Sequence, residues 1–157
     1  MVGFVVVSHS KSLAQEAISL AEEMKRYHFP IVNGSGTDGD FLGSNPLYIK
    51  DAIEKARTAQ GVLIFVDIGS SVLNSQVAIE FLEAEEIDIT NIKIADAPLV
   101  EGLIAGVAIN DEKADIDSIL DELKELKTFS KLTYWISSLS ILSFIDIKSK
   151  IKQEYPM

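Results

Sequence analysis

The stretch VGFVVVSHS, residues 2–10, joins an apolar run to a polar turn and decides the fold. Its β-branched residues are typical of a strand that is buried on both faces of a sheet. Residues 11–27 then place leucine, alanine and methionine on one stripe of a helix, with charged residues opposite. Ser10 or Ser12 can cap this helix, and Gln15 lies three residues after Ser12, as a capping box requires. The chain therefore begins with a predicted strand, turn and helix.

The alternation of strand and helix recurs along the next hundred residues. Further strands are predicted at 29–33, 61–66 and 92–95, and helical patterns follow at 46–56, about 70–86, from 98 onward and at about 114–127. Asn45 and Pro46 supply a cap and a first-turn proline to the second helix. This order predicts a flavodoxin-like α/β fold, in which helices cover both faces of a central, mainly parallel four-stranded sheet to make three layers. In that order of strands, the first and third are neighbours.

Composition excludes several classes of protein. The chain has 157 residues, 47% of them apolar, a mean hydropathy of +0.20 and a net charge of −10. Such an acidic chain repels phosphate backbones, so we expect no nucleic-acid partner. Cysteine is absent, which removes disulfides, thiolate metal sites and cysteine catalysis. No apolar run reaches about 18 residues and the start lacks the pattern of a leader peptide, so we expect no membrane partner.

Charge divides the chain into two parts. Residues 1–127 carry a net charge of −12, whereas residues 128–157 carry +2 and lose the helical periodicity. We therefore predict one domain over 1–127 and a C-terminal extension of unknown role over 128–157. The extension is either unrelated to the domain or a strand and helix used in dimerisation.

Polar residues stand where the predicted parallel strands end. His9 follows the first strand, Asp67 the third and Asp96 the fourth. His9 is either a satisfied polar residue of a turn or a nucleophile, since imidazole titrates near neutrality. If the first and third strands are neighbours, Asp67 can accept a hydrogen bond from the Nδ1–H of His9 and leave Nε2 as the nucleophile. Asp96 is expected to cap the next helix; a metal site built from all three side chains has no defined spacing and is set aside.

A glycine-rich loop follows the second strand. Its letters GSGTDG, residues 34–39, match a dinucleotide-binding fingerprint, but that motif belongs after the first strand and opens a helix directly. The loop either folds over the edge that carries His9, with Thr37 as a hydroxyl donor, or is a mobile surface loop. His28, the second histidine, is expected to interact with a helix end rather than to act in catalysis.

Several short segments together resemble one family. They are residues 3–10, residues 36–38, residues 66–70 with Asn74 after them, and residues 96–102. In this order they are similar to the mannose-type enzyme IIA family of the phosphotransferase system, and within it to the phosphoryl-donor subunits of dihydroxyacetone kinases. The resemblance covers roughly residues 1–127.

The resemblance implies a phosphotransferase subunit. Its members accept a phosphoryl group from the phosphocarrier HPr on the histidine that matches His9, which the aspartate matching Asp67 orients. They pass the group to ADP on a nucleotide-binding subunit, and they are cytoplasmic homodimers; no cofactor bound by this chain is expected. We expect Ser10, Thr37, Ser70 and Ser71 to receive phosphoryl oxygens, and an apolar collar to dock partners, namely Phe41, Leu42, Ile68, Val72 and Leu99.

Two other functions share the same first step. The acceptor could be a IIB domain of a sugar transporter, or the chain could be a regulatory module that senses phosphorylation without passing it on. Residues 36–38 and 96–102 favour the kinase branch, and an ADP-binding partner would separate the three.

Overall fold

Four parallel strands form the centre of the structure, which is a computed structural model describing residues 1–128 and residue 130. They are β1 (Gly3–Val7), β2 (Ile31–Asn33), β3 (Val62–Val66) and β4 (Ile92–Ile94), in the order β2-β1-β3-β4. Phe4 of β1 lies opposite Ile31 on one side and Leu63 on the other. The four predicted strands, and the predicted neighbourhood of the first and third, are confirmed. Every strand pair is parallel among the described residues.

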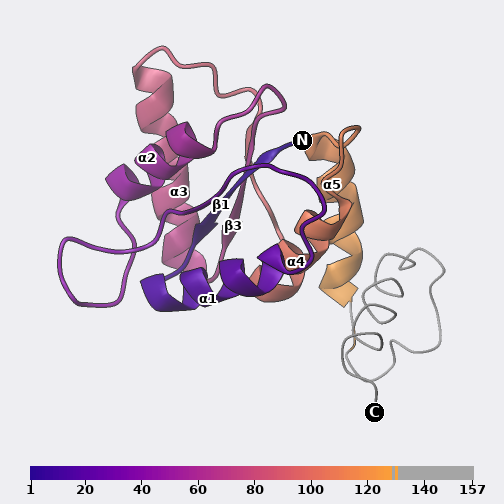
Figure 1. Ribbon diagram of the computed structural model, residues 1–157. Helices are drawn as coiled ribbons and strands as arrows, with labels where there is room; N and C mark the ends of the chain where they lie inside the picture. Colours follow the sequence, from indigo (N-terminus) through magenta and orange to yellow (C-terminus); the bar gives the residue numbers. More distant parts are fainter. Residues whose placement is uncertain (129, 131–157) are drawn as a thin grey trace. The chain divides into compact units, whose positions relative to one another are not determined.

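Five helices cover the two faces of this sheet. They are α1 (Lys11–Glu22), α2 (Pro46–Ala56), α3 (Gly69–Ala84), α4 (Leu99–Ile109) and α5 (Ile116–Lys124), followed by the 3₁₀ turn η1 (Glu125–Thr128). Figure 1 shows α2 and α3 on one face, and α1, α4 and α5 on the other. The predicted three-layer α/β fold is therefore confirmed.

Two separate clusters of side chains form the core, because successive residues of a strand point to opposite faces. Phe4 and Val6 point toward α1, α4 and α5, where Phe4 meets the rings of Phe29 and Phe65 edge to face, with centroids 5.3 and 5.0 Å apart. Val5 and Val7 point to the other face and pack among aliphatic side chains of α2 and α3. All of these side chains are fully or almost fully buried. The burial on both faces explains the continuous apolar run of β1.

Helix boundaries differ from the prediction at the end of α1. The helix stops at Glu22 instead of continuing to residue 27. Phe29 must leave the helix to reach the core, and Pro30 disfavours helical geometry in the residue before it. His28 consequently lies outside α1, in the segment that enters β2 at the amino edge of the sheet, so its expected role at a helix end is wrong.

Helix starts follow the predicted caps only in part. Ser10, not Ser12, caps α1, and its hydroxyl accepts a hydrogen bond from the N–H of Leu13 at 3.2 Å. Asn45 caps α2 as predicted, with Pro46 in the first turn. Asp96 does not cap α4, which begins after Pro98 without a side-chain cap; Asp96 pairs instead with the ammonium of Lys127.

Residues Met1–Lys127 form one compact unit. Both core clusters lie within it, from residue 1 to residue 126. The predicted extension over 128–157 lies outside the described residues, apart from residues 128 and 130. In the part of the chain that the structure describes, no helix has the length and hydropathy to span a membrane.

Candidate functional site

His9 and Asp67 meet at the carboxyl edge of the sheet. Val7 and Val66, the last residues of β1 and β3, lie opposite each other, so the polar residues that follow them are brought together. The Nδ1 atom of His9 lies 3.0 Å from Oδ1 of Asp67. The two side chains are 24% and 17% exposed, so the pair is partly shielded yet reachable from solvent.

The carboxylate of Asp67 is itself held by four donors. Its Oδ1 accepts from the hydroxyl of Ser71 at 2.6 Å and from the N–H of Ile68 at 2.7 Å. Its Oδ2 accepts from the N–H of His9 at 2.8 Å and from the hydroxyl of Ser8 at 2.9 Å. Burial, the largest single effect, raises the pKa of this carboxyl, but the hydrogen bonds from Ser71, His9 and Ile68 outweigh it and hold the pKa well below the usual range. Asp67 is therefore ionised at neutral pH.

An ionised carboxylate fixes the tautomer of the imidazole. Because it can only accept hydrogen bonds, the proton of neutral His9 resides on Nδ1, and Nε2 keeps its lone pair. The hydroxyl of the exposed Ser70 lies within hydrogen-bonding distance of Nε2, and that of Ser71 lies 3.2 Å from Nδ1. Two serines of the first turn of α3 thus contact the ring, one at each ring nitrogen.

Two buried serines that the sequence analysis did not single out support the site. The hydroxyl of Ser8 donates to Asp67 and accepts from the N–H of Ser10 at 3.0 Å. The N–H of Ser8 donates in turn to the hydroxyl of the buried Ser35 at 2.8 Å. The available signal was the position of Ser8 directly after an apolar strand, where a buried hydroxyl must find partners.

Ser10 and Thr37 do not contact the imidazole in the described structure. The hydroxyl of Ser10 caps α1, and that of Thr37 donates to the carbonyl oxygens of Gly39 and Phe41 at 2.9 and 3.0 Å. The loop of Thr37 does approach His9, but through its backbone, since the N–H of Gly43 donates to the His9 carbonyl at 2.8 Å. Of the four predicted phosphoryl-binding residues, only Ser70 and Ser71 touch the ring.

The predicted apolar collar is exposed in part. Phe41, Leu42 and Ile68 are 69%, 76% and 63% exposed. Val72 and Leu99 are half-buried, and each packs against one of the two core clusters. Leu73, which the sequence analysis did not name, is 63% exposed beside Val72 on α3.

Nothing among residues 1–128 resembles a metal centre. No group of three or more histidine, aspartate or glutamate side chains gathers in the described part of the chain. Asp96 pairs with Lys127 and does not join His9 and Asp67. What the site offers is an oriented imidazole beside the start of α3. The N–H groups there favour anions, and this helix start carries no side-chain cap. The fold and the site therefore define an α/β domain with an oriented, partly exposed imidazole at the carboxyl edge of its sheet.

Comparison with known proteins assigns this α/β domain to a family. Residues 3–120 match the EIIA-man family, described as the PTS system fructose IIA component, and the chain belongs to this family. The resemblance found in the sequence is therefore confirmed.

Named relatives point to one branch of the family. The chain is 34% identical over 123 residues to the PEP-dependent dihydroxyacetone kinase 2 phosphoryl donor subunit DhaM of Listeria innocua, matching 78% of this chain and 97% of that protein. It is 31% identical over 128 residues to DhaM of Providencia stuartii and 33% identical over 123 residues to DhaM of Escherichia coli, matching 80% and 76% of this chain. It spans about a quarter (26%) of the length of each of these two relatives.

A solved structure shares the fold. The crystal structure of the unknown-function protein EF1359 superposes with a TM-score of 0.66 at 36% identity, covering 79% of this chain and 94% of that one.

Proposed function

We propose that this chain is the phosphoryl carrier of a phosphoenolpyruvate-dependent dihydroxyacetone kinase. It accepts a phosphoryl group from HPr on His9 and passes it to ADP held by a nucleotide-binding subunit. The observation that carries the proposal is the partly exposed ring of His9, which ionised Asp67 fixes through Nδ1 and whose Nε2 faces the hydroxyl of the exposed Ser70. The relatives named as phosphoryl donor subunits support it.

The chemistry is two successive displacements at phosphorus. The Nε2 lone pair of His9 attacks the phosphorus carried by HPr; a new P–N bond forms as the P–N bond to the HPr histidine breaks, and that histidine keeps the electron pair. An oxygen of the ADP β-phosphate then attacks, the P–N bond to His9 breaks, and ATP forms. Asp67 accepts the hydrogen bond from Nδ1–H throughout, and its negative charge balances the positive charge that the ring acquires.

The loaded ring requires donors for its new charge. A phosphoryl group adds roughly −1.5 to −2 charges at neutral pH. The hydroxyl of Ser70 lies at Nε2, and the start of α3 has no side-chain cap, whereas the hydroxyl of Ser71 donates to Asp67. The Ser70 hydroxyl and the N–H groups at the start of α3 receive the phosphoryl oxygens, while Phe41, Leu42 and Ile68 form the exposed apolar surface on which partners dock.

The carrier acts in the cytoplasm as a homodimer and binds no cofactor, because the group it transfers is held covalently. The support is the family to which the chain belongs.

Labelling of the histidine tests the proposal. The protein is incubated with phosphoenolpyruvate, enzyme I and HPr, and mass spectrometry detects an acid-labile, base-stable phosphate. His9→Ala should abolish the label, whereas His28→Ala, which alters the exposed second histidine, should keep it. A wild-type chain that takes up no phosphate would overturn the proposal.

The acceptor is identified by discharging the labelled protein. Mixing it with a nucleotide-binding kinase subunit and ADP should form ATP at the rate at which the label disappears. Transfer to a IIB domain instead would indicate sugar transport, and a label that neither acceptor removes would indicate a regulatory module.

A further inference from the structure

The loop between β2 and α2 carries the most exposed apolar side chains at the site. Residues 36–44, here called the docking loop, hold Phe41 and Leu42. Gly36 and Ser44 form an isolated bridge that closes the loop, and φ values of +118° and +152° at Gly36 and Gly43 mark its two turns. The position of Phe41 and Leu42 therefore depends on how the two ends of this loop are held.

Asn74 holds the end of the loop near the site. It is half-buried on α3, and its amide donates to the carbonyl oxygen of Ser44 at 3.0 Å and to the Ser44 hydroxyl at 2.7 Å. Asn74 lies four residues after Ser70 and three after Ser71, so the three side chains share one face of the helix. The same rigid face therefore positions both the imidazole and the docking loop.

A short chain of bonds links this contact to the reacting residue. Ser44 is held by Asn74, and the neighbouring Gly43 donates its N–H to the carbonyl oxygen of His9 at 2.8 Å. The loop is thus tied to the backbone of the histidine as well as to the helix that contacts its ring.

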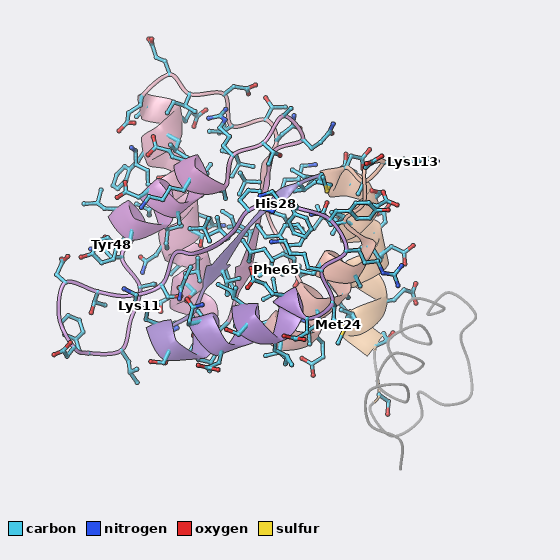
Figure 2. The ribbon with its side chains drawn as sticks, in the orientation of Figure 1. Lys11, Met24, His28, Tyr48, Phe65 and Lys113 are labelled. Atoms are coloured by element: carbon cyan, nitrogen blue, oxygen red, sulfur yellow. The ribbon has the colours of Figure 1, made fainter. Side chains whose placement is uncertain are left out.

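A second contact steadies the far side of the loop. The hydroxyl of Tyr48 donates to Oδ1 of Asp38 at 2.7 Å, and this hydrogen bond raises the pKa of the Tyr48 phenol. Figure 2 shows Tyr48 on α2 and Lys11 on α1, and both side chains approach Gly36. Asn74 holds the end of the loop that bonds to His9 through Gly43, and Tyr48 holds Asp38 near the start of the loop.

We propose that Asn74 is a positioning residue for phosphoryl transfer, acting by holding the docking loop in register with His9. The proposal rests on the proposed function. A loop that is already ordered spares the cost of ordering it when the partner binds. Asn74 therefore increases the affinity for phosphorylated HPr without touching the imidazole.

Labelling kinetics of Asn74→Ala test this role. The initial rate of His9 labelling is measured against the concentration of phosphorylated HPr. Loss of both hydrogen bonds should raise the half-saturating concentration about tenfold. The maximal rate should stay within about twofold, because Asp67, Ser70 and Ser71 still hold the ring. Gln76→Ala, at an exposed position on the same helix, should behave as the wild type.

A double-mutant cycle separates positioning from general support of the fold. Phe41→Ser with Leu42→Ser removes the apolar tip of the loop, and Asn74→Ala is then added to it. If Asn74 acts through the loop, the added substitution changes the half-saturating concentration less than twofold. A second full tenfold rise would overturn the proposal, as would an unchanged half-saturating concentration in Asn74→Ala alone.

If circular dichroism shows that Asn74→Ala does not fold, a milder variant tests the same contact. Ser44→Ala removes one of the two acceptors and should raise the half-saturating concentration about threefold, and no rise would overturn the role of this contact. A failure of the proposed function is a different result, since the wild-type chain would then take up no label at all.

Discussion

The imidazole of His9 owes its orientation to a carboxylate that is oriented first. Ser8, Ser71 and two backbone N–H groups occupy both oxygens of Asp67, so the carboxylate cannot turn away from the ring. A histidine in solution divides its proton between the two nitrogens, whereas this one must keep it on Nδ1. At the scale of single residues, the site therefore prepares Nε2 before any partner arrives.

Replacing the carboxylate by an amide should reverse this preparation. In Asp67→Asn, the amide can donate to Nδ1 and place the ring proton on Nε2, where it blocks attack. We expect labelling of His9 to slow by about 100-fold or more, and by more than in Asp67→Ala, which favours neither tautomer. Quench-flow labelling with phosphorylated HPr measures both rates. Equal rates in the wild type and Asp67→Asn would show that the carboxylate does not control the tautomer.

The carboxylate of Asp67 also makes the free energy of unfolding depend on pH at acidic pH. The pKa of Asp67 is lowered in the folded chain, so its stabilising contribution is complete well above the unfolded value of about 3.9 and declines as the pH falls below it. The difference in free energy of unfolding between the wild type and Asp67→Asn should therefore shrink by about 1 kcal/mol between pH 7 and pH 3. Urea unfolding at the two pH values measures it. A difference that grows in acid would contradict the lowered pKa.

The sequence predicts residues at strand ends better than it predicts their partners. His9 and Asp67 could be paired in advance, because parallel neighbours bring their carboxyl ends to one edge. Ser8 and Asn74 could not, since the partner of a short polar side chain depends on its rotamer and on backbone positions that periodicity does not encode. The same limit applies to Thr37. Its hydroxyl was expected to face the imidazole, but it donates to carbonyl oxygens within its own loop.

At the scale of elements, the close approach of strand and helix depends on small residues. A Cβ added at Gly3 of β1 would lie 1.7 Å from the carbonyl oxygen of Ala56, the last residue of α2. At Gly69, the first residue of α3, nothing lies within 4 Å of an added Cβ. Gly3 is therefore required by the close approach of β1 to the end of α2, whereas Gly69 is not required by any close contact.

A matched pair of substitutions tests this difference. Gly3→Ala should lower the free energy of unfolding by about 3 kcal/mol or more, because backbone must move to relieve the overlap. Gly69→Ala should leave it unchanged or raise it by up to about 1 kcal/mol, since alanine favours a helix. Chemical denaturation of both variants measures the effects. A Gly3→Ala chain as stable as the wild type would show that β1 and α2 separate easily.

Element boundaries were predicted where a local signal fixes them. Asn45 and Pro46 mark the start of α2, since one caps the helix and the other fits its first turn. The end of α1 was placed five residues too late, because Met24 continues the helical stripe. The packing of Phe29 against Phe4 overrides that stripe, and such a contact between distant residues is invisible to periodicity.

At the scale of the whole molecule, one compact unit of the structure ends where the charge of the sequence changes. Among the described residues, the members of both core clusters lie within 1–126, and the family matches residues 3–120. The acidic, periodic part of the sequence and the compact unit Met1–Lys127 end at the same place. The contacts described for His9 and its supporting residues, from Ser8 to Asn74, also lie inside this unit.

A chain ending at Lys127 should therefore fold and accept phosphate by itself. The truncation removes none of the core residues in the part of the chain that the structure describes, so we expect its urea midpoint to lie within about 0.5 M of that of the full chain and its unfolding to stay two-state. Its labelling rate at saturating phosphorylated HPr should match the full chain within about twofold, because the ring and its donors are unchanged. If the truncated chain folds but its labelling slows tenfold, the last thirty residues take a direct part in docking. If its cooperative unfolding transition is lost, part of the stabilising core lies beyond Lys127.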